Sequence, residues 1–350
     1  MLVHRSIVYA LASAALFGAS TPLAKLLLDD AAPLVVAGLL YLGSGVGLAA
    51  WLGVRRLFTG ATRASPIGRA QWPWLAGAIA AGGVAGPALL MFGLARIDGS
   101  AASLLLNLEA VLTAAIAWLV FRENVDRRIF LGMAAIVAGG VLLSWDQTPR
   151  AGGLAGPLLV AAACLAWAVD NNLTRKVSGG DAATIACLKG LVAGSVNLGL
   201  ALAAGAALPA PGTLLAAATL GLAGYGVSLA LFVVALRGLG TARTGAYFSV
   251  APFFGAGLAF AVLVETPSAA FWIAAALMAL GVWLHITEHH AHQHLHEPMQ
   301  HTHEHAHDEH HQHPHDFPWD GREPHVHPHE HPRLVHSHPH YPDLHHRHRH

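Results

Sequence analysis

A few polar side chains interrupt the apolar segments between residues 6 and 286, and these are the first candidates for chemistry. An ionised side chain at the centre of a bilayer costs roughly 2.5 kcal/mol or more, so each such residue requires a partner or a purpose. We predict no catalytic residue. The residues predicted for the substrate pathway or for proton coupling are Glu109, Asn107, Asp170, Asn171, Asn172 and Lys189.

Glu109 is the first candidate because it lies near the middle of its segment. A carboxylate in a low-dielectric surrounding can take up a proton and exchange it for a cation, although packing by hydrogen bonds alone is the alternative. Asp170 and Lys189 lie at similar depths on consecutive segments. They are expected to neutralise one another, either as an ion pair that fixes helix packing or as part of the pathway.

A second group of ligand-type side chains lies in the C-terminal tail, where 25 of the 26 His occur between His285 and His350. Neutral imidazole is a favoured ligand of Ni, Co, Cu and Zn, and a flexible chain can close two to four imidazoles around one ion. We therefore predict a tail that is disordered without a ligand and binds a divalent metal such as Ni, Co or Zn. The predicted metal ligands are His292, His294, His296, His301, His303, His305, His307, His325, His327, His329, His331, His336, His338 and His340.

The tail also has a simpler interpretation, as a low-complexity expansion that binds metal and has no part in the protein's activity. In either case metal binding should weaken steeply below about pH 6, because protons compete for imidazole at a pKa of ~6.5.

The composition places the candidate residues in a membrane protein. Of 350 residues, 54% are apolar and only 11% are charged, and the mean hydropathy is +0.49. These values exclude a soluble enzyme, a nucleic-acid binder and a secreted disulfide scaffold. Cys164 and Cys187 both lie inside apolar runs and are expected to be small buried hydrophobes. We expect no enzymatic activity and no required cofactor.

Ten apolar segments are separated by polar, Pro and Gly residues, which predicts an all-α membrane protein with ten transmembrane helices. One set of segment ends carries twelve Lys and Arg residues and the other set carries two. The positive-inside rule then predicts a multi-pass protein of a bacterial inner membrane with both termini in the cytoplasm. The segments lie near residues 6–28, 32–54, 72–95, 99–121, 129–145, 153–174, 182–206, 213–236, 242–264 and 268–286.

The two halves of the apolar region repeat one another. Gly140-Val141-Leu142-Leu143 is echoed by Gly281-Val282-Trp283-Leu284, and Glu123 is echoed by Glu265 at nearly the same offset. Because each half holds an odd number of spans, the second half is expected to be inverted across the membrane, an arrangement found in alternating-access transporters. The predicted domains are residues 1–145 and 146–286, two five-helix repeats, followed by the disordered His-rich tail, residues 287–350.

Several short stretches resemble the EamA-type drug/metabolite transporters. They are Phe17-Gly18 with Lys25, Trp167-Ala168 with Arg175, Asn107-Leu108-Glu109, Ala251-Pro252, and Glu123 and Glu265 at span ends. One departure is Ala110, because the family often has Pro at that position. The resemblance covers residues 6 to 286 and implies secondary transport, usually export.

We interpret the chain as an exporter of a divalent transition metal, Ni or Co, whose tail collects metal in the cytosol. The body with its His-rich tail looks like transporters of this type that act in nickel and cobalt resistance. The pathway offers only oxygen and amide ligands, so an exporter of an organic metabolite or amino acid remains an alternative. A non-transporting membrane metal sensor is another. The expected partners are the lipid bilayer and the metal or small-molecule substrate, with a homodimer left open and no nucleic acid.

Overall fold

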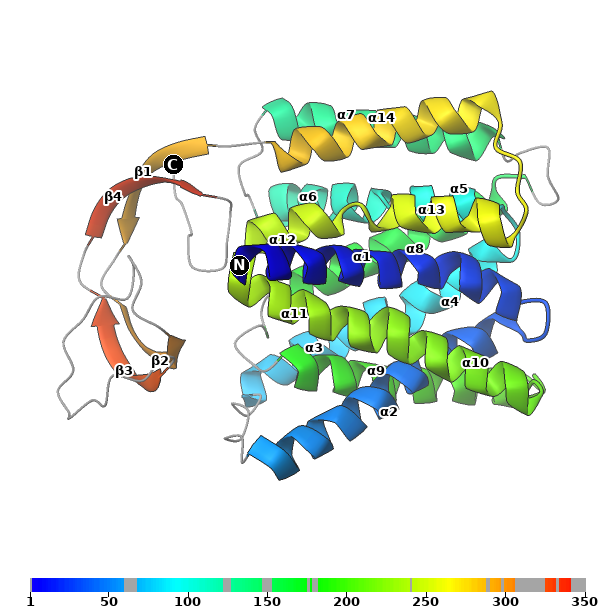
Figure 1. The fold of residues 1–350 in the computed structure, drawn as a ribbon, viewed down its shortest axis with the longest axis horizontal. Helices are drawn as coiled ribbons and strands as arrows, with labels where there is room; N and C mark the ends of the chain where they lie inside the picture. Colours follow the sequence, from blue (N-terminus) through cyan, green and yellow to red (C-terminus); the bar gives the residue numbers. More distant parts are fainter. Residues whose placement is uncertain are drawn as a thin grey trace. The chain divides into compact units, whose positions relative to one another are not determined.

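In the computed structural model, most of the described residues between Leu2 and Ile286 are helical (Figure 1). It describes residues 2–59, 68–121, 127–146, 153–174, 177, 182–239 and 241–287, and the tail segments 290–296, 299–305, 325–331 and 334–340. The chain divides into two compact units, Met1–Thr287 and Glu288–His350.

The helices of the first half are α1 (Leu2–Leu27), α2 (Pro33–Thr59), η1 (Arg69–Gln71), α3 (Trp72–Ala78), η2 (Ile79–Ala85), α4 (Gly86–Leu94), α5 (Gly99–Leu105), α6 (Leu108–Phe121) and α7 (Arg127–Asp146). Those of the second half are α8 (Ala155–Thr174), α9 (Ala182–Ala203), α10 (Pro211–Gly221), η4 (Leu222–Val227), α11 (Ser228–Leu239), α12 (Thr241–Phe248), α13 (Ala251–Val262) and α14 (Ala269–Ile286).

Among the described residues, eight continuous helical segments are long and apolar enough to cross a membrane. Two further apolar helices are shorter, Ala251–Val262 and Ala269–Leu284. These two coincide with the ninth and tenth segments predicted from the sequence. The ninth is short because the helix is interrupted between α12 and α13, where Pro252 follows the break.

Four helical segments depart from regular α-helix, and they do so at corresponding places in the two halves. A π-helical stretch, η2, lies between α3 and α4, and a second one, η4, lies between α10 and α11. A break separates α5 from α6, and another separates α12 from α13. A π-helical turn leaves backbone carbonyl groups without their usual partners, and such turns occur frequently at functional sites.

The helix contacts of the two halves also correspond. Helix α1 packs against α11 and α13, just as α8 packs against α4 and α6. Helix α2 packs along α9, and α7 packs along α14, a pair that lies together at one side of the bundle (Figure 1). The α2–α9 contact is close because a Cβ on Gly190 would meet the backbone of Gly45.

Large apolar side chains cover the outside of the bundle as well as its interior. Leu57, Trp145 and Trp283 are examples on the outside, with 83%, 72% and 53% of their surfaces exposed. A soluble protein rarely exposes contiguous apolar surface of this extent, whereas a lipid-facing surface requires it. The helical unit is therefore in contact with the lipid bilayer.

The tail, which the sequence predicts to be disordered without a ligand, contains the strands β1 (His290–His296), β2 (Met299–His305), β3 (His325–His331) and β4 (Leu334–His340). β1 pairs antiparallel with β4, and β2 pairs antiparallel with β3. The period-two alternation that we took only as a ligand pattern is also the repeat of a β-strand, which is why these segments can pair. His307 lies outside the described residues.

Candidate functional site

Glu109 stands at the second position of α6, immediately after the break that follows α5. Its Oε1 atom accepts a hydrogen bond of 2.9 Å from Nδ2 of Asn171 on α8. The same amide nitrogen lies 3.3 Å from Oγ1 of Thr113, one turn further along α6. Within the described part of the chain, Glu109 has no hydrogen bond or ion pair with a Lys or Arg side chain. The direct partner of the carboxylate is thus the neutral amide of Asn171.

Asp170 and Lys189 form the ion pair that the sequence predicts. Nζ of Lys189 lies 2.6 Å from both carboxylate oxygens of Asp170, and Oγ1 of Thr174 donates a third hydrogen bond of 2.8 Å. The side chains are 8% exposed for Asp170 and 18% for Lys189. This buried carboxylate is therefore already neutralised by the protein's own cation.

The π-helical stretch η2 packs next to this ion pair. The carbonyl oxygen of Gly82 accepts hydrogen bonds from Tyr41 Oη (3.0 Å) and from Trp167 Nε1 (2.9 Å). A Cβ on Gly82 would overlap the carboxylate of Asp170, so only glycine fits there. Thr113, Tyr41 and Trp167 are not among the residues predicted from the sequence. Their types are common in membrane helices, and only the π-helical turn reveals the carbonyl to which Tyr41 and Trp167 donate.

Two buried amide oxygens have no hydrogen-bond partner among the residues that the structure describes, Oδ1 of Asn172 and Oδ1 of Asn197. Nδ2 of Asn172 donates to the backbone carbonyls of Ala168 (2.9 Å) and Thr113 (3.3 Å), so the amide is held between α8 and α6. An unsatisfied buried acceptor is costly and calls for an explanation. The Asn172 oxygen next to the Thr113 backbone supplies an acceptor for a bound cation, an ammonium group or water.

Asn107 does not join the other predicted residues. Its Nδ2 atom donates to the carbonyl of Leu104 (2.9 Å) and lies 3.9 Å from Sδ of Met278 on α14. Asn107 lies in the break between α5 and α6, whereas Glu109 lies within α6, which explains why the two side chains face different neighbours. Of the residues predicted for the pathway, the structure therefore places five close together, namely Glu109, Asp170, Asn171, Asn172 and Lys189. Asn107 lies apart from them and takes part in the packing between α5 and α14.

Aromatic rings gather on the neighbouring helices α1, α2, α12 and η4. The ring of Phe17 lies 5.6 Å from that of Tyr225 and 5.3 Å from that of Phe248, measured between centroids. Tyr41, which contacts Gly82 with its hydroxyl, lies 5.5 Å from Tyr225. Tyr41 therefore connects the charged groups to an apolar, aromatic surface.

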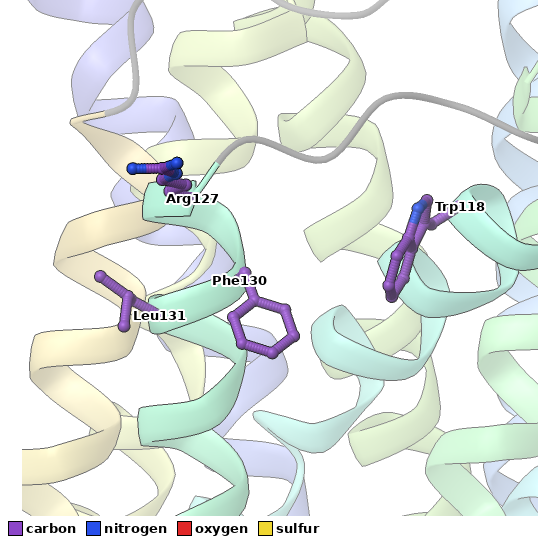
Figure 2. Close-up of a pocket in the computed structure, with 4 residues that line it drawn as sticks. All are labelled: Trp118, Arg127, Phe130 and Leu131. Carbon is purple, nitrogen blue, oxygen red and sulfur yellow. The ribbon is translucent and has the colours of Figure 1, made fainter.

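A pocket of about 330 Å³ lies elsewhere, between α6 and α7 (Figure 2). Its lining consists of Trp118, Arg127, Phe130 and Leu131. None of the predicted pathway residues lines it, so it is not the candidate site.

The described residues contain no group of three or more His, Cys, Asp or Glu side chains that could hold a metal ion. The side chains of the tail histidines lie outside this description.

A bundle of long apolar helices with an apolar exterior and a few polar groups inside defines a multi-pass membrane protein. The model of the EamA-like transporter family matches residues 4–145 and, a second time, residues 154–287. The chain belongs to the EamA-like transporter family.

Two further comparisons agree with this assignment. The chain is 32% identical over 208 residues to a protein called "Uncharacterized transporter" of Methanothermobacter thermautotrophicus, a match that covers 57% of this chain and 60% of that relative. A protein of known crystal structure superposes with a TM-score of 0.58, over 80% of this chain and 94% of the other, at 20% identity. That likeness shows the fold alone.

Proposed function

We propose that the chain is a proton-coupled secondary transporter in which the carboxylate of Glu109 binds cargo and proton in alternation. The observation that carries this proposal is the contrast between two carboxylates inside the helical unit, Asp170, which is buried, and Glu109, which is partly buried. Asp170 is neutralised by Lys189 at 2.6 Å, whereas Glu109 accepts a hydrogen bond from the neutral amide of Asn171 and forms no ion pair among the described residues. A carboxylate without a fixed cation is the group that can exchange one ion for another.

We infer that the ten predicted segments are ten spans, arranged as two inverted repeats over residues 1–145 and 146–286. The double family match and the corresponding π-helical stretches and helix breaks support this arrangement. A cargo site at the interface of such repeats lies near the middle of the bilayer, which suits the position of Glu109 after a helix break. From the distribution of Lys and Arg we further propose a bacterial inner membrane and cytoplasmic termini.

For the cargo, we propose a divalent transition-metal cation, Ni or Co, moved out of the cytosol. In the cycle, the metal binds Glu109 and the proton on that carboxylate leaves. After the metal is released on the other side, a proton returns to the same oxygen. Rotation of the Asn171 amide exchanges its Nδ2 for its Oδ1, so that the same residue can bond the carboxylate or ligate the metal.

The strand pairing of the tail supports the proposal of a metal cargo, because it places His residues of neighbouring strands opposite one another. In the β1–β4 pair, His292 stands opposite His338 and His294 opposite His336. In the β2–β3 pair, His303 stands opposite His327. A tail rich in imidazole that is covalently attached to the transport unit would raise the effective concentration of metal for that unit. We propose the tail as a metal collector and not as a required cofactor site.

A small organic metabolite or amino acid is the second candidate cargo, and the aromatic rings favour it. Tyr41 and Tyr225 lie beside a site that holds both a free carboxylate and an ammonium group. A zwitterion could pair its ammonium group with Glu109 and its carboxylate with Lys189, while its side chain contacts the rings. A third alternative is a metal sensor in which no cargo moves.

The experiment is radiolabelled Ni and Co retention in metal-sensitive cells, comparing the full chain, the chain ending at His289, Glu109→Gln and the control Asp29→Asn. Asp29 is an exposed carboxylate beyond the end of α1. We expect cells that express the full chain or Asp29→Asn to retain less Ni and Co than cells without the protein. Cells that express Glu109→Gln should show no such reduction. Equal retention in all four would overturn metal export, and the truncation shows whether the tail gathers cargo.

A further inference from the structure

The end of the bundle where α1 finishes contains a second ionic cluster, separate from the candidate site. Nζ of Lys25 on α1 donates hydrogen bonds to the carbonyl oxygens of Leu94 (2.9 Å) and Ile97 (2.5 Å). These carbonyls belong to the end of α4 and to the turn that leads into α5. The ammonium group therefore holds α1 to the α4–α5 turn through charge-assisted hydrogen bonds.

Glu265 forms hydrogen bonds to the other side of the same turn. Its Oε1 atom accepts a hydrogen bond from the backbone N–H of Gly99 (2.6 Å), and its Oε2 atom accepts one from the N–H of Ser100 (2.9 Å). Both carboxylate oxygens are thus used on the first two residues of α5. Glu265 follows α13, so this contact joins the two stretches of chain that match the family model separately.

The two charged side chains converge on Gly99. A Cβ at Gly99 would lie 3.2 Å from Cδ of Lys25 and 3.4 Å from Oε1 of Glu265, and closer still to the side chain of Leu263. Val264, directly before Glu265, has a φ angle of 54°, which is a strained conformation for a β-branched residue. Strain of this kind persists only where surrounding contacts enforce it, and it occurs at switch regions.

We propose that Lys25 and Glu265 form a latch that closes this end of the transporter and opens when cargo passes there. The latch consists of charged groups on backbone N–H and C=O groups, and water can replace each of these partners when the helices separate. Moving α5 also moves the helix break and Glu109, which lies ten residues after Gly99. The state of the latch is thereby linked to the candidate site. The proposal requires that the chain is a transporter and does not depend on the cargo.

The test is thiol labelling of the purified full-length chain in lipid nanodiscs, with Cys164 and Cys187 replaced by Ala. Ser103→Cys serves as the reporter at the latch end, because Ser103 is fully buried one turn after Gly99. Thr244→Cys on α12 serves as the reporter at the opposite end, where Thr244 is also fully buried. Figure 1 shows α12 beside the start of α1, and the α13–α14 connection at the other end of the bundle.

With Glu265→Gln or Lys25→Met, we expect a polar maleimide to label Ser103→Cys about fivefold faster or more, as for the loss of a charge-assisted hydrogen bond. Labelling of Thr244→Cys should stay constant or slow down, because opening one end of an alternating-access transporter closes the other. Arg96→Gln and Asp30→Asn, exposed charges near the latch end, should leave both rates unchanged.

Two results would overturn the latch. In the first, the maleimide labels Ser103→Cys in the Glu265→Gln and Lys25→Met variants at the same rates as in the two control variants. In the second, both reporters become faster together, which shows that the residues only stabilise the bundle. Because no cargo is added, neither result depends on the role proposed for Glu109.

Discussion

Replacing Lys189 by Met tests whether the ion pair of the candidate site is a buried, mutually dependent unit. The variant leaves the Asp170 carboxylate, 8% exposed, with Thr174 as its remaining hydrogen-bond donor in the described structure. Breaking a buried pair by removing one partner typically costs 3–5 kcal/mol. Lys189 is 18% exposed, which allows some relaxation toward solvent, so we expect a loss of about 3 kcal/mol in the free energy of unfolding.

The double variant Asp170→Asn/Lys189→Met removes both charges. It should recover most of the loss and lie within about 1 kcal/mol of the parent. The single variant Asp170→Asn completes the double-mutant cycle and should also be destabilised, so the coupling energy should be at least about 2 kcal/mol. Unfolding in mixed detergent micelles can be followed by Trp fluorescence, with Arg69→Gln as an exposed-charge control. If Lys189→Met unfolds like that control and the cycle shows no coupling, the pair does not neutralise a buried carboxylate and the contrast with Glu109 is lost.

Three further predictions concern the neighbouring groups and the tail. Gly82→Ala should destabilise the protein by about 2 kcal/mol, because its Cβ would overlap the Asp170 carboxylate, whereas Gly53→Ala, which meets nothing within 4 Å, should change unfolding by less than about 0.5 kcal/mol. Trp167→Phe removes one of the two donors to the Gly82 carbonyl and should cost about 1 kcal/mol in the same assay, so an unchanged midpoint would contradict that hydrogen bond. Nickel bound to the full chain should be retained at pH 7.5 and lost between about pH 6.5 and 5, since imidazole is protonated as the pH falls through its pKa. Nickel binding can be measured by calorimetry for the full chain and for the chain ending at His289. Equal binding by the two proteins would show that the tail does not supply the nickel ligands.

The transmembrane architecture is largely predictable because it depends on composition. Apolar segments of about 20 residues have few alternatives to membrane helices. The same reasoning finds the ion pair, since Asp170 and Lys189 are rare charges at similar depths on consecutive segments. It also selects Glu109, although it gives no sign that the partner would be Asn171.

Features that depend on helix distortion and rotation are not predictable in this way. The break before α6 turns Asn107 toward Met278 and away from Glu109, and a break shows no clear periodic signal in the sequence. The acceptor role of Gly82 arises from a π-helical turn, which local propensity does not specify. Glu265 is recognisable as a repeated residue at the end of a span, whereas its contact with Gly99 depends on how α13 meets α5. The alternating His pattern of the tail was interpreted as a source of metal ligands, and the same period of two also suits a β-strand.

The most direct test of the central claim is the number of protons released when Ni²⁺ binds the purified chain ending at His289. Calorimetric titrations in buffers of different ionisation enthalpy, near pH 6, give this number without interference from the tail. Alternation of proton and metal on Glu109 predicts measurable proton release by the parent and none by Glu109→Gln. Equal proton release by both proteins, or nickel binding without any release, would contradict the account.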